Sequence, residues 1–254
     1  MLIDTHCHLY LEDYKNDAEA MIARAEAIGV ERFYLPAIDS HTTGAMLAFE
    51  ERFSGKCFAM IGIHPCSVNE RVEEELAQVQ KWLFQRPFAA IGEIGLDFYH
   101  DTTFKEQQYQ AFHQQVEWAL QHSAPIVIHS RNAMQETIGV IKAYIDKGLR
   151  GIFHCFSGSE ADARKIIDTG FYLGIGGVVT YKNAGLAEAI KNIPLEYIVL
   201  ETDAPYLSPT PHRGKRNEPA YLERVVAKLA DIKGISSAEI ADITTANAKK
   251  IFGN

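Results

Sequence analysis

Cysteine is scarce in this chain of 254 residues, and the four cysteines show no pairing pattern. Cys7, Cys57, Cys66 and Cys155 lack C-x-x-C spacing and mostly lie in or beside apolar, strand-like segments. This argues against a disulfide framework and favours a reducing cytoplasm as the compartment. Cys7 stands between two histidines, so its side chain is expected to point away from them, as a small core residue.

The chain also lacks long apolar runs and any excess of basic residues. No run approaches the length of a transmembrane helix, and the first residues read as a core strand, so neither a membrane segment nor a signal peptide is expected. With 25 Lys and Arg against 33 Asp and Glu, the net charge of −8 argues against a non-specific duplex-DNA binder. A nucleic-acid enzyme stays open, because bound divalent cations add positive charge that a residue count misses.

Linkers and several common catalytic motifs are absent as well. No Pro-, Gly- or Ser-rich linker divides the sequence, and it contains no Walker A, H-E-x-x-H or G-x-S-x-G motif. The chain is 47% hydrophobic, which is ample for a large core. Because its length suits one α/β barrel, we predict a single domain over residues 1–254.

Strand-like and helix-like segments alternate from one end of the chain to the other. Most strand-like segments are almost continuously apolar, as expected for parallel strands buried on both faces. Eight strands, each followed by a helix, give the count of a (β/α)8 TIM barrel; the alternative, an open doubly wound sheet, usually has fewer strands. Ser236 and Glu239 form a capping box that opens the last helix. The predicted strands are 2–5, 32–38, 57–63, 88–94, 125–130, 150–156, 171–177 and 197–203, and the predicted helices are 15–28, 41–53, 73–84, 104–122, 132–147, 159–168, 185–191, 218–233 and 236–252.

Most of these strands end in an unusual polar residue. The first strand delivers His6 and His8, and their i, i+2 spacing turns both imidazoles to one side. In a barrel, the carboxyl ends of the strands meet at the face where active sites form. The other polar residues at strand ends are His64, Glu93, His129, His154, Glu201 and Asp203.

Four histidines with a glutamate and an aspartate suit two adjacent divalent ions, because imidazoles bind borderline metals and carboxylates bridge them. Two such ions produce hydroxide at neutral pH and stabilise the attacking and leaving oxygens of an ester. Glu93 is central in the strand order and is expected to bridge the ions. Asp203 is expected to bind metal and to take up the proton of the water. The remaining histidines are assigned to loops or helix surfaces: His41, His100, His113 and His122.

The densest basic stretch of this acidic chain, residues 212–216, follows the last strand at the same rim. Its position favours contact with an anionic substrate, through Arg213 and Lys215, over a purely solvated loop. Arg131 adds a further cation at the end of the fifth strand.

Glycines and aromatic residues also lie near strand ends. Gly174, Gly176 and Gly177 end the seventh strand and either leave room for a substrate backbone or form a tight turn. The candidates for stacking on bases are Phe98, Tyr99, Phe156, Tyr181 and Tyr206.

Six short motifs carry these residues: Asp4-Thr5-His6-Cys7-His8, Gly62-Ile63-His64-Pro65, Gly92-Glu93-Ile94-Gly95-Leu96-Asp97, His129-Ser130-Arg131, His154-Cys155-Phe156-Ser157-Gly158 and Glu201-Thr202-Asp203-Ala204-Pro205. In this order and over the full length of the chain, they resemble the TatD family of metal-dependent hydrolases. That family is similar to the wider amidohydrolase superfamily of metal-dependent TIM barrels.

The resemblance implies a two-metal site, with one ion held by His6, His8, Glu93 and Asp203 and the other by Glu93, His129 and His154. It also implies that His64 contacts substrate phosphate rather than metal, and the basic loop fits the family pattern. Family members act as magnesium- or manganese-dependent deoxyribonucleases, described as 3′–5′ exonucleases that prefer single strands. DNA is therefore the implied partner.

We expect a cytoplasmic, monomeric hydrolase that cleaves DNA phosphodiesters with a hydroxide held between two ions. A rival enzyme would use the same hydroxide on a carboxyl-type bond, in a small amide, a lactone or the ester of a D-aminoacyl-tRNA. A third interpretation is a non-catalytic metal-binding module, which the complete ligand set disfavours. Mixed His and carboxylate ligands suit Zn²⁺ or Mn²⁺, whereas phosphodiester chemistry favours Mg²⁺.

Overall fold

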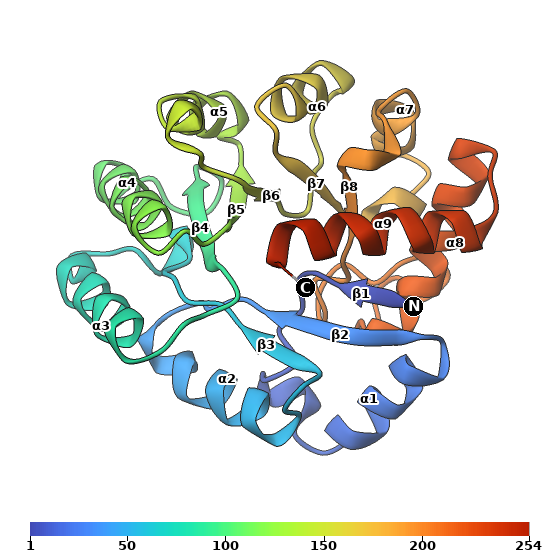
Figure 1. Cartoon of the computed structure of the whole chain (residues 1–254), viewed down its shortest axis with the longest axis horizontal. Coiled ribbons are helices and arrows are strands. Elements are labelled where there is room, and N and C mark those ends of the chain that lie inside the picture. The colour runs from blue at the N-terminus through green and yellow to red at the C-terminus, as the bar shows by residue number, and fades with distance from the viewer. Residues whose placement is uncertain (254) are drawn as a thin grey trace.

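Eight parallel strands surround the centre of the computed structural model, which describes residues 1–253 (Figure 1). They pair in two sheets with the orders β1-β2-β3 and β4-β5-β6-β7-β8, and every pair is parallel. The eight strands predicted from the sequence are therefore confirmed. Their bounds are β1 Leu2–Asp4, β2 Val30–Leu35, β3 Cys57–Ala59, β4 Ile91–Asp97, β5 Ile126–Arg131, β6 Gly151–Phe153, β7 Tyr172–Ile175 and β8 Ile198–Leu200.

Backbone contacts join the edges of the two sheets. Ile61 forms a parallel bridge with Ile91, which connects the end of the first sheet to β4. At the other seam, the backbone N–H and the hydroxyl of Thr5 both donate to the carbonyl of Leu200, at 3.0 and 2.9 Å. With both seams bridged, the arrangement is that of the predicted (β/α)8 barrel.

Helices follow the strands and cover the outside of the barrel, and α9 packs against β1 and β8 beside the N-terminus (Figure 1). The side chains of Asp39, Ser159 and Ser236 cap α2, α6 and α9 in capping boxes; the box at Ser236 confirms the sequence prediction. The helices are α1 Ala18–Ala27, α2 Ser40–Arg52, α3 Val72–Gln85, α4 Lys105–Gln121, α5 Met134–Lys142, α6 Glu160–Ile167, α7 Leu186–Ile190, α8 Leu222–Lys233 and α9 Ser237–Phe252.

Several elements are shorter than the sequence predicted. The strand predicted at 57–63 ends at Ala59, and the strand predicted at 197–203 ends at Leu200, because the chain there leaves the ladder to place polar side chains over the barrel. The helix predicted at 218–233 begins with a 3-10 turn at Pro219–Tyr221 and continues as α8 from Leu222; such turns are frequent at helix N-termini.

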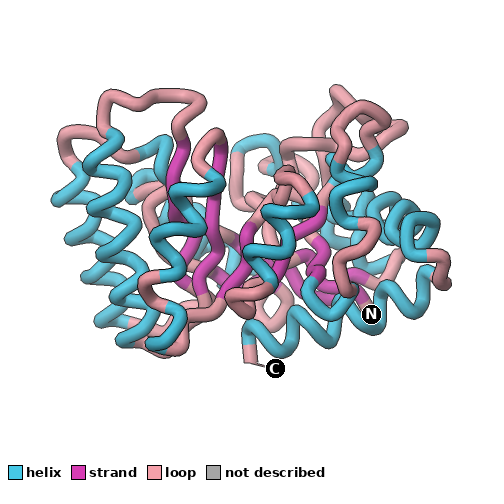
Figure 2. The backbone as a smooth tube through the Cα atoms, turned by 90° about the horizontal axis from the view of Figure 1, so that it is seen from above, coloured by secondary structure: helices cyan, strands magenta, loops and turns pink. Residues whose placement is uncertain are grey.

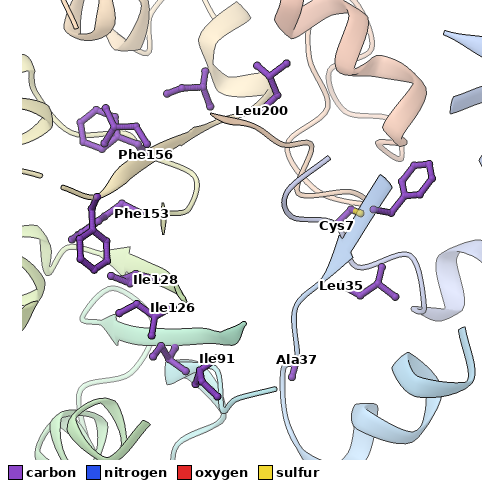
Figure 3. Close-up of a cluster of buried hydrophobic side chains, with 14 of the residues drawn as sticks. Cys7, Leu35, Ala37, Ile91, Ile126, Ile128, Phe153, Phe156 and Leu200 are labelled. Atoms are coloured by element: carbon purple, nitrogen blue, oxygen red, sulfur yellow. The ribbon is translucent and has the colours of Figure 1, made fainter. Parts of the chain in front are cut away.

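Two layers of apolar side chains make up the core. One lies between the strands and the outer helices, with Ile91, Ile126, Ile128 and Phe153 contributed by neighbouring strands (Figure 3). A second, smaller cluster gathers residues from the strands or the positions beside them together with two residues of α9. Its fully buried members are Ile3, Tyr34, Met60, Ala90, Val127, Ile152, Val199, Ala248 and Ile251.

The longer loops lie on the side of the barrel opposite the two termini (Figure 2). Since β1 starts two residues from the N-terminus, this is the side of the carboxyl ends of the strands. Among residues 1–253, no helix combines the length and the apolar character needed to cross a membrane.

Candidate metal centre

The period of two in a strand places polar side chains directly above the second, smaller apolar cluster, which contains Val127 and Ile152. His129 follows Val127 by two residues in β5, and His154 follows Ile152 by two residues at the end of β6. Alternate residues of a strand face the same side, so both imidazoles project from the carboxyl end of the barrel. The sequence prediction that strand-end polar residues meet at one rim is confirmed for these side chains.

Glu93 lies between the histidines of the two sheets. It stands at a bulge in β4, where Gly92 pairs with Val127 and Ile94 with Ile128, and a bulge re-aims a side chain. Its Oε2 lies 3.1 Å from Nε2 of His6, and its Oε1 lies 2.9 Å from Nδ1 of His129. With 3% of its side chain exposed, Glu93 presents one oxygen to each side of the centre.

Asp203 faces the same point from the last strand. Its Oδ1 lies 3.7 Å from Nε2 of both His6 and His8 and 3.8 Å from Nε2 of His154. Burial, opposed by His154 and assisted by the charge of Glu93, raises the pKa of Asp203 to about 8. Without a bound cation, the carboxyl of Asp203 therefore holds a proton near neutral pH.

Hydrogen bonds orient two of the histidines. The Tyr10 hydroxyl donates to the carbonyl of Pro36 at 2.7 Å, so it accepts from Nδ1 of His8 at 3.1 Å. In β5, Nε2 of His129 lies 2.9 Å from Oδ2 of Asp97. In each case the other ring nitrogen faces an oxygen of Glu93, at 3.7 Å for Nε2 of His8 and 2.9 Å for Nδ1 of His129, and in the neutral ring this nitrogen would be the metal ligand.

A further carboxylate, that of Glu201, lies beside His154. Its Oε1 accepts the backbone N–H of Cys155 at 2.6 Å and lies 3.0 Å from Nδ1 of His154. Burial raises the pKa of Glu201 to about 7. The structure also gives a reason for Gly174 that differs from both sequence interpretations, because a Cβ there would lie 2.2 Å from Oε2 of Glu201.

The residues present fit two adjacent divalent ions. Both ring nitrogens of His6 are buried without a hydrogen-bond partner among the described residues, which leaves a polar group that a metal would satisfy. Imidazole and carboxylate donors together suit borderline and hard divalent metals. Three groups have donor atoms within 4.8 Å of one another: His6, His8 and Asp203; His6, Glu93 and His154; and His64, Glu93 and His129.

The division of these ligands between two ions stays a prediction. The ring of His154 stacks on that of His6, and the two ring centroids are 3.4 Å apart. His129 lies on the other side of Glu93, beside His64. The other five predicted ligands therefore surround Glu93, and His154 lies with His6 and Glu93 rather than with His129 alone.

His64 presents a donor to the centre rather than a lone pair. Its Nδ1 accepts the backbone N–H of Cys66 at 3.1 Å, so the neutral ring carries its proton on Nε2. That nitrogen lies 3.1 Å from Nδ1 of His129 and 3.4 Å from Oε1 of Glu93. A substrate oxygen is a better partner for this N–H than a metal ion, and the contact of His64 with substrate phosphate stays a prediction.

A cavity of about 1020 Å³ opens over these residues. Arg131 lines it, with its guanidinium 4.3 Å from the ring centre of Tyr99, and 51% of the neighbouring Tyr206 is exposed. Other residues of its lining are His8, His64, Glu93, His100, His129, His154, Cys155 and Asp203.

The basic loop contributes less to this cavity than the sequence suggested. Arg213 lies 4.5 Å from the ring centre of Tyr181 and lines a separate pocket of about 430 Å³, and Lys215 is exposed. Within the loop, Arg216 forms an ion pair with Asp17 at 2.7 Å. Arg216 thereby fastens the loop to Asp17 of the N-terminal region, and the contact of Arg213 and Lys215 with substrate stays a prediction.

Asp97, Glu201 and Tyr10, which lie beside ring nitrogens of His129, His154 and His8, had no role in the sequence prediction. Asp97 ends β4, and Glu201 precedes Asp203 by two residues, so strand alternation could have found both. His100 lies in a loop as expected, yet its Nδ1 is 2.9 Å from Oδ2 of Asp97 and it lines the cavity.

Comparison with known proteins decides the family. Residues 3–253 match the family described as TatD related DNase. The chain belongs to the TatD family. It is a metal-dependent hydrolase, as its relatives in the family are named.

Three known proteins are similar to this TatD protein over almost its whole length. It is 41% identical over 254 residues, covering 99% of both chains, to the uncharacterized metal-dependent hydrolase YabD of Bacillus subtilis. It is 31% identical over 258 residues, covering 99% of this chain and 97% of the relative, to the 3′-5′ ssDNA/RNA exonuclease TatD of Cronobacter sakazakii. The crystal structure of YjjV, a TatD homolog of Escherichia coli, superposes with a TM-score of 0.93 at 30% identity, covering 100% of this chain and 98% of that one.

Proposed function

We propose that this TatD protein is a deoxyribonuclease that removes nucleotides from the 3′ end of single-stranded DNA with two divalent metal ions. The position of Glu93 carries the proposal: its two oxygens lie 3.1 Å from His6 and 2.9 Å from His129. A buried carboxylate that offers one oxygen to each of two imidazole groups has the geometry of a bridge between two ions.

Glu93 and the side chains around it have different roles in the proposed hydrolysis. His6, His8, Glu93, His129, His154 and Asp203 would hold the ions. When bound, two such ions lower the pKa of water and neutralise the charge of a phosphate. Asp203, whose Oδ1 faces the histidines of the centre, would take up the proton of the attacking water.

Two side chains are suited to hold the phosphate. The Nε2–H of His64 donates to a non-bridging oxygen, because its Nδ1 is committed to the backbone of Cys66. Arg131 adds a guanidinium at the cavity wall, and such groups recognise phosphate in a bidentate manner. Both positions support a phosphodiester as the bond that is cleaved.

Single-stranded DNA is the substrate that the surroundings favour. Exposed Tyr206 and Arg131, whose guanidinium stacks on Tyr99, line the cavity and offer flat surfaces on which unpaired bases stack. The family description and the name of the Cronobacter sakazakii relative also concern nucleases. We propose Mg²⁺ or Mn²⁺ as the working ions, with Zn²⁺ as an alternative occupant.

We further propose that the protein works as a monomer in the cytoplasm. The four cysteines, all within the described residues, are free, as expected in a reducing compartment.

The choice of substrate is the decisive experiment. The purified protein is incubated with a 5′-labelled single-stranded oligonucleotide, its duplex, a D-aminoacyl-tRNA and a lactone, each with EDTA, Mg²⁺, Mn²⁺ or Zn²⁺. We expect a metal-dependent ladder that shortens from the 3′ end on the single strand and slower reaction on the duplex. Hydrolysis of the D-aminoacyl-tRNA or the lactone with an intact oligonucleotide would overturn the proposal in favour of a carboxyl-type bond.

A further inference from the structure

A second group of potential metal ligands lies beside the metal centre, at the rim of the barrel. It consists of Cys66, which follows β3, Asp97, which ends β4, and His100 in the loop after β4. The Sγ of Cys66 is 3.4 Å from Oδ2 of Asp97 and 3.5 Å from Nδ1 of His100, and these last two atoms are 2.9 Å apart. One sulfur, one oxygen and one nitrogen therefore face a common point.

We propose that Cys66, Asp97 and His100 form a separate, mononuclear site for Zn²⁺ or a similar thiophilic divalent cation. Zinc binds thiolate at about 2.3 Å and imidazole or carboxylate at about 2.0–2.2 Å in a tetrahedron, so its ligand atoms lie about 3.3–3.6 Å from one another. The two distances from Cys66 already meet this requirement. The contact of His100 with Asp97 must lengthen by a few tenths of an ångström, which an exposed loop residue accommodates.

Hydrogen bonds fix the carboxylate of Asp97 in the orientation that a metal ligand needs. Its side chain is 1% exposed, and its Oδ1 accepts the backbone N–H groups of Tyr99 and His100, both at 2.9 Å. The side chain of Gln108 accepts the backbone N–H of Asp97 at 2.9 Å and donates to its carbonyl at 3.1 Å. These contacts fix the carboxylate and direct Oδ2 toward Cys66 and His100.

The carboxylate of Asp97 also carries its charge. Burial raises the pKa of Asp97, but hydrogen bonds from His129 and from His100 outweigh that effect and hold it below its ordinary range. Cys66 is positioned by its backbone, whose N–H donates to Nδ1 of His64. Replacing the Cys66 side chain therefore leaves this contact in place. On binding, the Cys66 thiol gives its proton to solvent and the thiolate becomes the ligand.

The proposed site differs from the metal centre in exposure and in chemistry. Cys66 and His100 are exposed, so a fourth position is open to water or to an anionic oxygen in the cavity that His100 lines. A thiolate selects zinc over magnesium or manganese. The ring of His129 lies between the proposed site and the metal centre, with its Nδ1 at Glu93 and its Nε2 at Asp97. A cation bound by Asp97 would therefore influence the metal centre through the imidazole of His129.

Cobalt titration tests the proposal directly, because a thiolate bound to Co²⁺ gives an intense near-ultraviolet charge-transfer band. The metal-free protein, Cys66→Ser and Cys155→Ser are titrated with Co²⁺ in parallel. Cys155 is the matched control, because it is the other cysteine grouped with potential ligands, His154 and Glu201. We expect the band in the native protein and in Cys155→Ser, and its loss in Cys66→Ser.

Zinc content gives an independent measure. After dialysis against Zn²⁺, Cys66→Ser and His100→Ala are each expected to retain one equivalent less than the native protein, with unchanged circular dichroism. No charge-transfer band, a band lost only in Cys155→Ser, or equal zinc content in all variants would overturn the site. Both measurements report binding, so they stand whether or not the protein proves to be a nuclease.

Discussion

Gly174 leaves the space that the carboxylate of Glu201 occupies. A Cβ at position 174 would lie 2.2 Å from Oε2 of Glu201, closer than real Cβ atoms come to any neighbour. The other oxygen of Glu201 lies 3.0 Å from Nδ1 of His154. A side chain at this position of β7 would therefore displace the carboxylate that lies beside His154, the predicted metal ligand that follows β6.

Gly174→Ala is expected to weaken metal binding without unfolding the barrel. The new methyl group displaces Glu201, and loss of such an outer carboxylate typically costs about 10–100-fold in metal affinity or activity. Metal affinity by calorimetry and melting temperature of the metal-free protein provide the measurements.

Gly139→Ala is the matched control, because a Cβ at this position inside α5 meets nothing within 4 Å. It should leave metal affinity unchanged and stabilise the protein by about 0.5–1 kcal/mol, the usual gain of alanine over glycine in a helix. Equal metal affinity in both alanine variants would contradict the role given to Gly174.

His64→Ala is expected to lower kcat/KM on an oligonucleotide by about 100-fold, the usual cost of removing one aligned donor to developing charge. Metal content should not change, because its Nδ1 is held by the backbone of Cys66 and its Nε2 carries a proton. His41→Ala, on the exposed start of α2, is the control for an imidazole lost elsewhere. A drop in bound metal in His64→Ala would make His64 a ligand instead.

Arg131→Ala and Arg213→Ala should separate the two pockets. Arg131 lines the main cavity and Arg213 the smaller one, so only the first change should raise KM for a dinucleotide, by about 10-fold for one lost charged hydrogen bond. Both should raise KM for a longer oligonucleotide. Identical effects on the two substrates would mean that the pockets do not divide the strand between them.

Asp203→Asn is expected to change the pH dependence of stability of the metal-free protein. In the unfolded chain this carboxyl ionises near 3.8, and in the folded chain its pKa is about 8. Between these values the folded state retains a proton that the unfolded state has lost, so this contribution to stability falls as pH rises from about 4 to about 8. The amide that replaces the carboxyl in Asp203→Asn does not ionise, so the variant does not lose this contribution to stability as pH rises.

Melting temperatures in EDTA at about pH 5 and about pH 8 measure this difference. The variant should gain stability relative to the native protein as pH rises. A constant difference between the two proteins would show that Asp203 is ionised in the folded state even without metal.

The part of the metal centre that the sequence predicted lies mainly where side chains alternate regularly along a strand. His129 and His154 repeat the inward direction of Val127 and Ile152, and a period of two is legible in any strand. The bulge at Glu93 breaks this period, so its place near a strand end and its central position in the strand order identified it, rather than alternation.

Contacts between distant elements were not legible in the sequence. The fit of Gly174 to Glu201 and of Cys66 to Asp97 depends on how neighbouring strands align, and the pairing of Arg216 with Asp17 joins positions 199 residues apart. The same limit explains the strands that end early, because their last residues turn toward partners supplied by other strands.

The rate of nucleotide release as metal is returned to the protein tests the central claim most directly. EDTA-treated native protein and Glu93→Gln are titrated with Mn²⁺ on a 5′-labelled single-stranded oligonucleotide, and bound metal is measured in the same samples. We predict that activity in the native protein appears as two equivalents bind, and that Glu93→Gln binds less metal and loses activity by several orders of magnitude. Full activity with one bound equivalent, or comparable turnover by Glu93→Gln, would contradict a two-metal centre bridged by this carboxylate.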